Sequence, residues 1–200
     1  MQKDKLEEFK QKVKGMDAPN IIKVSFDYIG EKNIALASSM SAEDQVLTDM
    51  MLKYNSNAQI FTIDTGRLPQ ETYDVIDLTR KKYGIKIEVL FPKSKSVERT
   101  VNEHGANLFY DSVDLRKLCC NIRKAEPLRK KLSTLKAWIC GIRRDQSITR
   151  NEMTAIEWDY KFNLFKVNPI IEWKEKQVWA YIKENKIPYN ILHDKEPTSG

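Results

Sequence analysis

Cysteine is scarce in this chain, and so are the features that direct a protein to a membrane. The 200 residues contain three cysteines, Cys119, Cys120 and Cys140. So small and odd a number argues against a disulfide framework and leaves metal ligation or burial as roles for the thiols. No apolar run approaches the ~20 residues of a membrane span, and the charged first segment lacks the apolar core of a signal peptide. We therefore expect a cytoplasmic protein that is not associated with a membrane.

Charge alone leaves the ligand class open. Lysine and arginine together number 34 against 28 acidic residues, a net charge of +6. A basic excess favours anionic ligands, whether nucleotides, sulfate or nucleic acid. No motif of an RNA- or DNA-binding fold is present, so nucleic acid is not an expected partner. The two histidines, His104 and His193, have no partner in the sequence and are interpreted as surface or structural residues.

Short apolar runs alternate with amphipathic segments along most of the chain. Strands are predicted over residues 33–38, 58–64, 86–91 and 137–142, with short extended segments at 155–160 and 163–169. Helices are predicted over 42–54, 69–84, 95–105, 111–135 and 173–185. Strand–helix alternation is typical of a parallel sheet covered on both faces, with ligands bound beyond the carboxyl ends of the strands. We expect an N-terminal helical segment, residues 1–30, and an α/β domain over 31–200.

The loop after the first strand is built from small polar residues. Ser38, Ser39 and Ser41 precede a helix, where backbone N–H groups and hydroxyls are able to bind an anion. The alternative is a simple helix cap, with Ser41 at the N-cap position and Asp44 closing a capping box. The loop has neither the lysine of a Walker A motif nor the glycines of a dinucleotide fingerprint.

The loop after the second strand carries Asp64, Thr65, Gly66 and Arg67. Thr65 and its neighbouring backbone suit a ribose or an adenine edge, and Arg67 adds a fork of donors. These residues also form an ordinary turn before Pro69, so both interpretations stay open.

Adjacent cysteines are the most specific feature of the sequence. On a helix, Cys119 and Cys120 point about 100° apart, which suits a polynuclear cluster better than a mononuclear zinc site. Arg123 and Lys124 would offset the negative charge of such a cluster, and Lys124 lies about one turn beyond Cys120. The alternative is a pair of buried thiols on an apolar helix face.

Two arginines follow the fourth strand. Arg143 and Arg144 suit a phosphate or sulfate because a guanidinium donates two parallel hydrogen bonds; surface solubility is the alternative. Arg150 is a further candidate of lower weight. Cys140, inside the apolar strand, is interpreted as a small core residue.

These segments together resemble the sulfonucleotide reductases. The first loop resembles a degenerate form of the SGGxDS pyrophosphate loop, in which Ser39, Met40 and Ser41 replace the glycines. Residues 64–73 resemble the family's DTGRLPxETY segment, 119–129 its CCxxRKxEPLR signature, 141–147 its GxRRDQS loop and 187–194 its IPYNPLHD segment. The cysteine signature is that of the adenylyl sulfate branch.

The resemblance implies a three-layer α/β fold like that of the adenine nucleotide α-hydrolases. It implies reduction of adenylyl sulfate to sulfite and AMP in sulfate assimilation, with thioredoxin as reductant. It also implies a [4Fe–4S] cluster, with Cys119 and Cys120 as two of its four ligands, and a catalytic Lys124 linking cluster to substrate. Assembly with further copies of the chain stays open.

The family pattern continues with a CxxC pair and a nucleophilic cysteine in an ECGxH tail, which the printed sequence does not contain. We therefore expect these 200 residues to be catalytically incomplete. Two alternatives remain. One is an ATP-pyrophosphatase that adenylates its substrate, like the small subunit of sulfate adenylyltransferase, and the other is a non-catalytic nucleotide-binding module.

Overall fold

The computed structural model describes residues 2–147, 150 and 152–194, and its centre is a six-stranded sheet. The strand order is β3-β2-β1-β4-β6-β5. All neighbours pair in parallel except β5 and β6, which are antiparallel. The strands are β1 Ile34–Ala37, β2 Gln59–Ile63, β3 Glu88–Leu90, β4 Ala137–Ile139, β5 Ile156–Asp159 and β6 Leu164–Val167. The mostly parallel sheet predicted from the sequence is confirmed.

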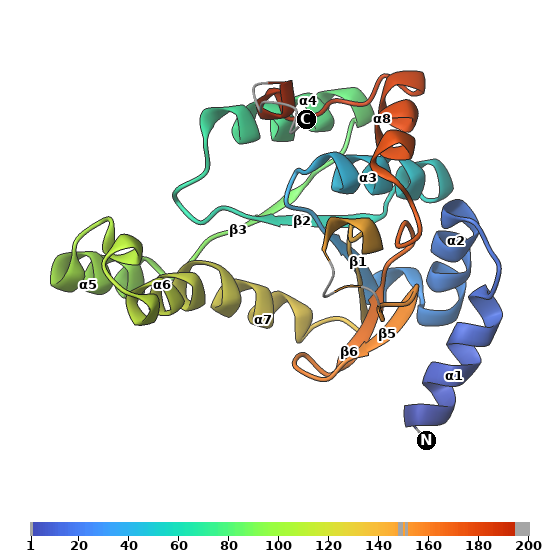
Figure 1. Cartoon of the computed structure of the whole chain (residues 1–200), viewed down its shortest axis with the longest axis horizontal. Helices are drawn as coiled ribbons and strands as arrows, with labels where there is room; N and C mark the ends of the chain where they lie inside the picture. Colours follow the sequence, from blue (N-terminus) through green and yellow to red (C-terminus); the bar gives the residue numbers. More distant parts are fainter. Residues whose placement is uncertain (1, 148–149, 151, 195–200) are drawn as a thin grey trace.

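Helices cover both faces of this sheet, as Figure 1 shows: α3, α4 and α8 lie on one side and α7 on the other. The helices are α1 Gln2–Val13, α2 Ala18–Ile29, α3 Ala42–Tyr54, α4 Gln70–Tyr83, α5 Ser94–His104, α6 Val113–Cys120, α7 Glu126–Leu132 and α8 Glu175–Glu184. Short helices are η1 Glu31–Asn33, η2 Leu108–Tyr110, η3 Asn121–Ala125, η4 Arg144–Gln146 and η6 Ile191–Asp194. None of the described helices is long and apolar enough to cross a bilayer.

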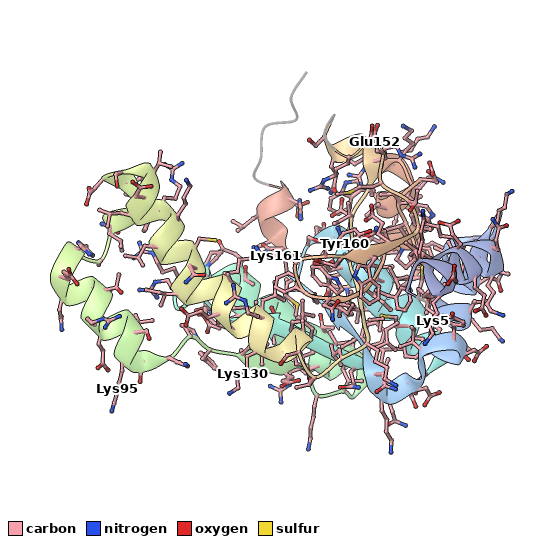
Figure 2. All side chains as sticks on the ribbon, turned by 90° about the horizontal axis from the view of Figure 1, so that it is seen from below. Lys5, Lys95, Lys130, Glu152, Tyr160 and Lys161 are labelled. Carbon is pink, nitrogen blue, oxygen red and sulfur yellow. The ribbon has the colours of Figure 1, made fainter. Side chains whose placement is uncertain are left out.

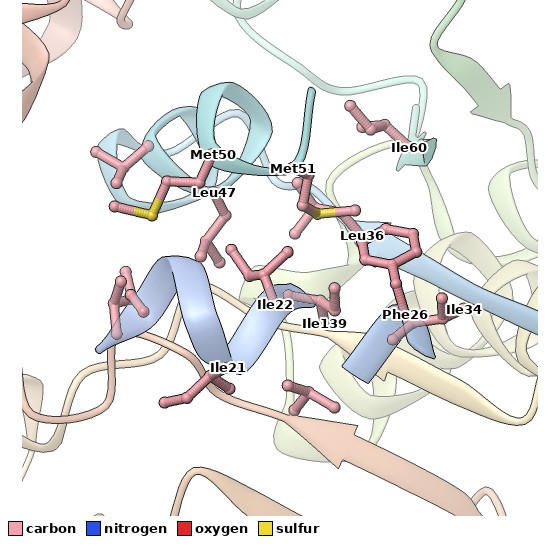
Figure 3. Packing of buried hydrophobic residues seen from close by; sticks show 14 of the residues in the cluster. Ile21, Ile22, Phe26, Ile34, Leu36, Leu47, Met50, Met51, Ile60 and Ile139 are labelled. Carbon is pink, nitrogen blue, oxygen red and sulfur yellow. The ribbon is translucent and has the colours of Figure 1, made fainter. Parts of the chain in front are cut away.

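The core follows from the two-residue period of the strands. In β1, Ile34 and Leu36 face the larger core cluster, whereas Ala35 faces the smaller one. The larger cluster also holds Ile22 and Phe26 of α2, which are at most 1% exposed and pack against α3 in Figure 3. Burial of a phenylalanine or isoleucine side chain contributes about 1.5–3 kcal/mol. Because α1 and α2 complete this core, the N-terminal helices pack as part of the same unit.

The helix predicted over 111–135 is divided in three. Between α6 and α7 the chain forms a π-helical turn, η3, in which the N–H of Glu126 donates to the carbonyl of Asn121. Pro127, at the start of α7, has no N–H to continue a regular ladder. Together with α5, α6 forms a lobe that projects beyond the sheet in Figures 1 and 2, and Lys95 marks the start of α5. The π-turn is therefore the joint between this lobe and the sheet, and such turns occur often at functional sites.

The segment after α8 is held on α3 and α4. The amide of Gln45 donates to the carbonyl of Pro188 at 2.8 Å, and the amide of Asn190 donates to Thr72 at 3.1 Å. Lys82 adds hydrogen bonds to the carbonyls of Asn185 and Lys186. These contacts fix the C-terminal part of the described chain against the face of the sheet that carries α3.

Candidate functional site

A pocket of about 520 Å³ opens at the carboxyl ends of β1, β2 and β4. This is the edge at which parallel sheets of this kind bind ligands. Its wall combines apolar side chains with two acidic and two basic ones, which come from the three strands, the loops after them, the start of α3 and the η3–α7 segment. The lining residues are Ala37, Ser38, Ser39, Ser41, Glu43, Asp44, Phe61, Thr62, Ile63, Thr65, Leu68, Lys124, Leu128, Trp138, Cys140, Gly141, Ile142, Gln146 and Arg150.

The loop after β1 borders the pocket, as the sequence predicted, but most of its donors are already used. The hydroxyl of Ser41 caps α3 by accepting from the N–H of Asp44 at 3.3 Å. The hydroxyl of Ser38 accepts from the N–H of Met40 at 3.1 Å. Met40 has a φ of +62°, a left-handed conformation that costs a residue with a Cβ about 1–2 kcal/mol. Its buried side chain offsets that cost.

The carboxylate of Asp44 holds the loop together. Its Oδ2 accepts from the N–H of Ser39 at 2.6 Å and from the Ser39 hydroxyl at 2.7 Å. Its Oδ1 accepts from the N–H of Gly141 at 3.2 Å, which ties the loop after β1 to the loop after β4. Asp44 is 4% exposed, and this desolvation raises its pKa against the opposing effect of the Ser39 hydrogen bonds. The predicted capping box is wrong in this detail, because the carboxylate bonds Ser39 rather than Ser41.

Arg143 contacts a glutamate that sequence reasoning did not connect with it. Its Nε donates to Glu43 at 2.9 Å in a pair whose side chains are at most 10% exposed. Gln146 donates to the same Glu43 oxygen at 2.9 Å, and Arg150 donates to Gln146. Arg150 lines the pocket, whereas Arg143 is buried and is not among the lining residues. A substrate-binding role for Arg143 stays a prediction, and its guanidinium forms an ion pair with Glu43 of the same chain.

Two other predicted arginines lie outside the pocket lining. Arg144 pairs with Glu172 at 2.6 Å and donates to the carbonyl of Met153 at 2.8 Å. Arg67 donates to the carbonyl of Ala106 and to Asn107, both at 2.9 Å. The first anchors the loop after β4 near α1 and α8, and the second links the loop after β2 to the α5–α6 lobe.

In the turn after β2, Asp64 makes hydrogen bonds within the protein, whereas Thr65 lines the pocket. Asp64 accepts from the N–H of Gly66 at 2.7 Å and from the hydroxyl of Tyr73 at 2.9 Å. This hydrogen bond raises the pKa of Tyr73. Arg123 donates to the carbonyl of Thr65 at 2.7 Å and so joins η3 to the turn, while the Thr65 side chain lines the pocket.

Lys124 and Arg150 are the two basic side chains among the described residues that line the pocket. Lys124 comes from η3 and is exposed, and its ammonium has no hydrogen bond or ion pair with another described residue. An unpaired ammonium beside a cavity is available for an anionic ligand. The predicted position of Lys124 in the site therefore agrees with the structure, although its catalytic role is a prediction.

The adjacent cysteines lie at the end of α6, outside the pocket lining. Cys119 is 9% exposed and borders a small gap among apolar residues of α5 and η2, while Cys120 is exposed. Thiolates are the ligands that iron–sulfur clusters take, so the donor type fits such a cluster. The number does not: no group of three or more histidine, cysteine or acidic side chains with metal-binding geometry occurs among the described residues.

Cys140 is buried, as predicted, but it stands in the pocket wall rather than in the interior alone. Desolvation raises the pKa of its thiol well above the usual range. A thiol held in the protonated form is a poor nucleophile. The structure therefore agrees with the interpretation of Cys140 as a packing residue.

Several wall residues were not recognised from the sequence. Phe61, Leu128 and Trp138 give the pocket an apolar side, and the buried Glu43 and the exposed Gln146, joined by a hydrogen bond, form a polar corner. Only Gln146 had a sequence signal, inside the segment 141–147. The others belong to apolar or helical patterns whose side-chain direction depends on the fold.

The sheet order, the helix layers and the pocket at the strand ends define a mostly parallel α/β fold of the kind that binds small ligands at the carboxyl edge of its sheet. The chain belongs to the phosphoadenosine phosphosulfate reductase domain family, whose model matches residues 33–199. It is 46% identical over 167 residues to the adenosine 5'-phosphosulfate reductase of Burkholderia cepacia, covering 82% of this chain and 67% of the relative. It is 43% identical over 163 residues to that of Allochromatium vinosum, covering 82% and 64%.

The solved structure of phosphoadenylyl-sulfate reductase from Candida auris has a TM-score of 0.80 and 23% identity, covering 94% of this chain and 89% of that one. At this identity the likeness supports the fold alone. The chain spans about two thirds of the length of the two curated relatives.

Proposed function

We propose that this chain is the sulfonucleotide-binding part of a cytoplasmic, thioredoxin-dependent adenylyl sulfate reductase. The observation that carries the proposal is the pocket at the strand ends, into which Lys124 and Arg150 project from two different segments. Adenylyl sulfate joins an adenosine to adjacent phosphate and sulfate groups. A pocket with an apolar side and two cations matches that distribution of charge.

The pocket divides naturally between the two halves of such a substrate. Phe61, Leu128 and Trp138 offer apolar surface to the adenine. The cations would bind the phosphosulfate and stabilise the negative charge that moves onto AMP as it leaves. Lys124 is the residue proposed to act at the reacting group, because its ammonium has no other described partner.

The reaction requires a thiolate that these residues do not supply. That thiolate attacks the sulfur of adenylyl sulfate, the sulfur–oxygen bond to AMP breaks, and an enzyme thiosulfonate forms. A dithiol of thioredoxin then gives two electrons, becomes a disulfide and releases sulfite together with the enzyme thiol. Cys140 is unsuitable as nucleophile because burial raises its pKa.

Cys119 and Cys120 are proposed as half of the ligand set of a [4Fe–4S] cluster, whose other two thiolates would come from outside the described residues. Bound there, the cluster would supply a polarising charge to the segment that carries Lys124, which follows Cys120 by four residues. Brown colour, with absorbance near 400 nm, is expected from the whole protein and not from the 200 residues alone. Cys119→Ser and Cys120→Ser should each abolish it, while Cys140→Ser should keep it. Retention of colour in either of the first two variants would exclude these ligands.

Binding is the sharpest test of the pocket. Calorimetric titration should detect adenylyl sulfate and AMP, and Lys124→Ala should weaken adenylyl sulfate binding about 10- to 100-fold, the value of one charged hydrogen bond. Lys130→Ala, on the outer side of α7 (Figure 2), is the matched control and should leave the affinity within about twofold. Equal affinities for both variants would refute the proposed phosphosulfate site.

Turnover separates the enzyme from a binding module. The whole protein, given adenylyl sulfate and reduced thioredoxin, should release sulfite and AMP in equal amounts. Binding without sulfite in the whole protein would favour the non-catalytic module. Consumption of ATP with release of pyrophosphate would favour adenylyl transfer instead.

A further inference from the structure

We infer that Gln146 is a positioning residue, which holds the guanidinium of Arg150 at the pocket and leaves its positive charge free for an anionic ligand. The inference rests on the proposed sulfonucleotide function and adds to it the residue that orients one of the two cations. Its basis is the set of hydrogen bonds around one side-chain amide, which joins the start of α3 to the loop after β4 and to Arg150.

The amide of Gln146 is held at both of its ends. Its Nε2 donates to Glu43 at 2.9 Å, while its Oε1 accepts from the N–H of Arg143 at 3.2 Å and from the guanidinium of Arg150. Turning the amide over would place a donor against the Arg150 donors and an acceptor against the Glu43 carboxylate. The partners therefore determine the orientation of the amide, and its oxygen faces Arg150.

The anchor of this arrangement is a buried ion pair. Glu43, in the first turn of α3, accepts from Arg143 Nε at 2.9 Å, and the two side chains are 10% and 7% exposed. The same Glu43 oxygen accepts from the amide of Gln146. Because breaking a buried ion pair is strongly destabilising, Glu43 gives Gln146 an acceptor that stays in place.

The charge of its partner distinguishes Arg150 from the two arginines that follow β4. Arg143 and Arg144 pair with carboxylates, those of Glu43 and Glu172. Arg150 instead bonds a neutral amide, and it has no ion pair with another described residue. A carboxylate would also hold Arg150, but it would oppose the attraction between the guanidinium and a bound anion. Because a guanidinium has five N–H donors, Arg150 retains donors for a ligand in the pocket that it lines.

The first experiment needs no ligand. In the ¹⁵N-labelled chain, relaxation of the arginine Nε–H signals reports side-chain motion, and Arg150→Lys identifies the signal of Arg150. That side chain should be rigid in wild type and mobile in Gln146→Met, which keeps the side-chain length without the amide. Gln177→Met is the matched control. Gln177 likewise accepts from an N–H three residues earlier, that of Lys174 at 2.8 Å, but it lies outside the pocket lining, so Arg150 should stay rigid.

Calorimetric titration with AMP shows whether this order contributes to binding. Gln146→Met should weaken AMP binding about 3- to 10-fold, because a long side chain then has to be ordered when the ligand binds. In an Arg150→Ala background the same change should alter the affinity less than about twofold, since Gln146 acts through Arg150. A merely structural role would weaken binding in both backgrounds. Gln177→Met should keep the wild-type affinity.

Gln146 is exposed, so its replacement removes little packing, and Gln146→Ala is the second variant if circular dichroism shows that Gln146→Met does not fold. Equal Arg150 mobility in wild type and a folded Gln146 variant would overturn the inference. So would unchanged AMP affinity in that variant, or an equal loss of affinity with and without Arg150. If wild type binds neither AMP nor adenylyl sulfate while Gln146→Met still releases Arg150, the proposed function alone is refuted.

Discussion

Replacing Gly141 by alanine should destabilise the fold at the junction between the two pocket loops. The added Cβ would meet the Asp44 Oδ1 at 2.4 Å, the Glu43 Cβ at 2.9 Å and the Asp44 nitrogen at 3.0 Å. Two of these atoms belong to the backbone and the Cβ of α3, and the third ends a short side chain that two hydrogen bonds hold on Ser39, so the loop after β4 has to move away from α3. That movement also breaks the hydrogen bond from the Gly141 N–H to Asp44.

The magnitude follows from these two effects. Overpacking typically costs 1–3 kcal/mol and the loss of a hydrogen bond to a charged group costs about as much, so the free energy of unfolding should fall by about 2–6 kcal/mol. For a chain of this length the melting temperature should fall by roughly 4–24 °C. Thermal denaturation followed by circular dichroism measures the shift, and urea denaturation measures the free energy.

Gly84→Ala is the control that separates collision from backbone strain. Gly84 has a φ of +65° and nothing within 4 Å of the added Cβ, so its cost of about 1–2 kcal/mol comes from conformation alone. Combining Gly141→Ala with Asp44→Ser removes one of the three close contacts and should restore part of the lost stability. A melting temperature for Gly141→Ala within 2 °C of wild type would refute the close approach of the two loops.

Three further changes test other parts of the structure. Phe26→Ala should lower the free energy of unfolding by about 3–5 kcal/mol in urea denaturation, because Phe26 is 1% exposed in the larger core; a loss below 1 kcal/mol would contradict its place there. Tyr83→Phe removes a 2.8 Å hydrogen bond to Asp49 and should cost about 1–2 kcal/mol, with AMP affinity unchanged in titration. Because burial raises the pKa of Asp44 above 3.8, the folded state binds its proton more tightly, so wild-type stability should fall as the pH rises from 3.8 through the folded pKa. Asp44→Asn should lack that part of the pH dependence when melting curves are compared across the range.

The element order was predictable because local pattern and tertiary structure agree over most of the chain. The helix predicted over 42–54 is α3, and the four apolar runs are β1 to β4. The division of the helix over 111–135 was not predicted, although Pro127 lies within it. A proline near a helix start is compatible with several backbone geometries. The local sequence therefore does not specify the π-helical hydrogen bond from the N–H of Glu126 to the carbonyl of Asn121.

The wall of the pocket shows why cations near a strand end are hard to assign from sequence. Arg143 and Arg144 follow β4 directly and were the favoured ligands, yet their guanidinium groups pair with Glu43 and Glu172. Glu43 is a hundred residues away along the chain, and its only local signal was an acidic first turn of a helix. A motif identifies which residue types gather at an edge, but side-chain direction depends on partners from other strands. Arg150, which had lower weight in the sequence, lines the pocket and donates to Gln146, whose amide donates in turn to the buried Glu43.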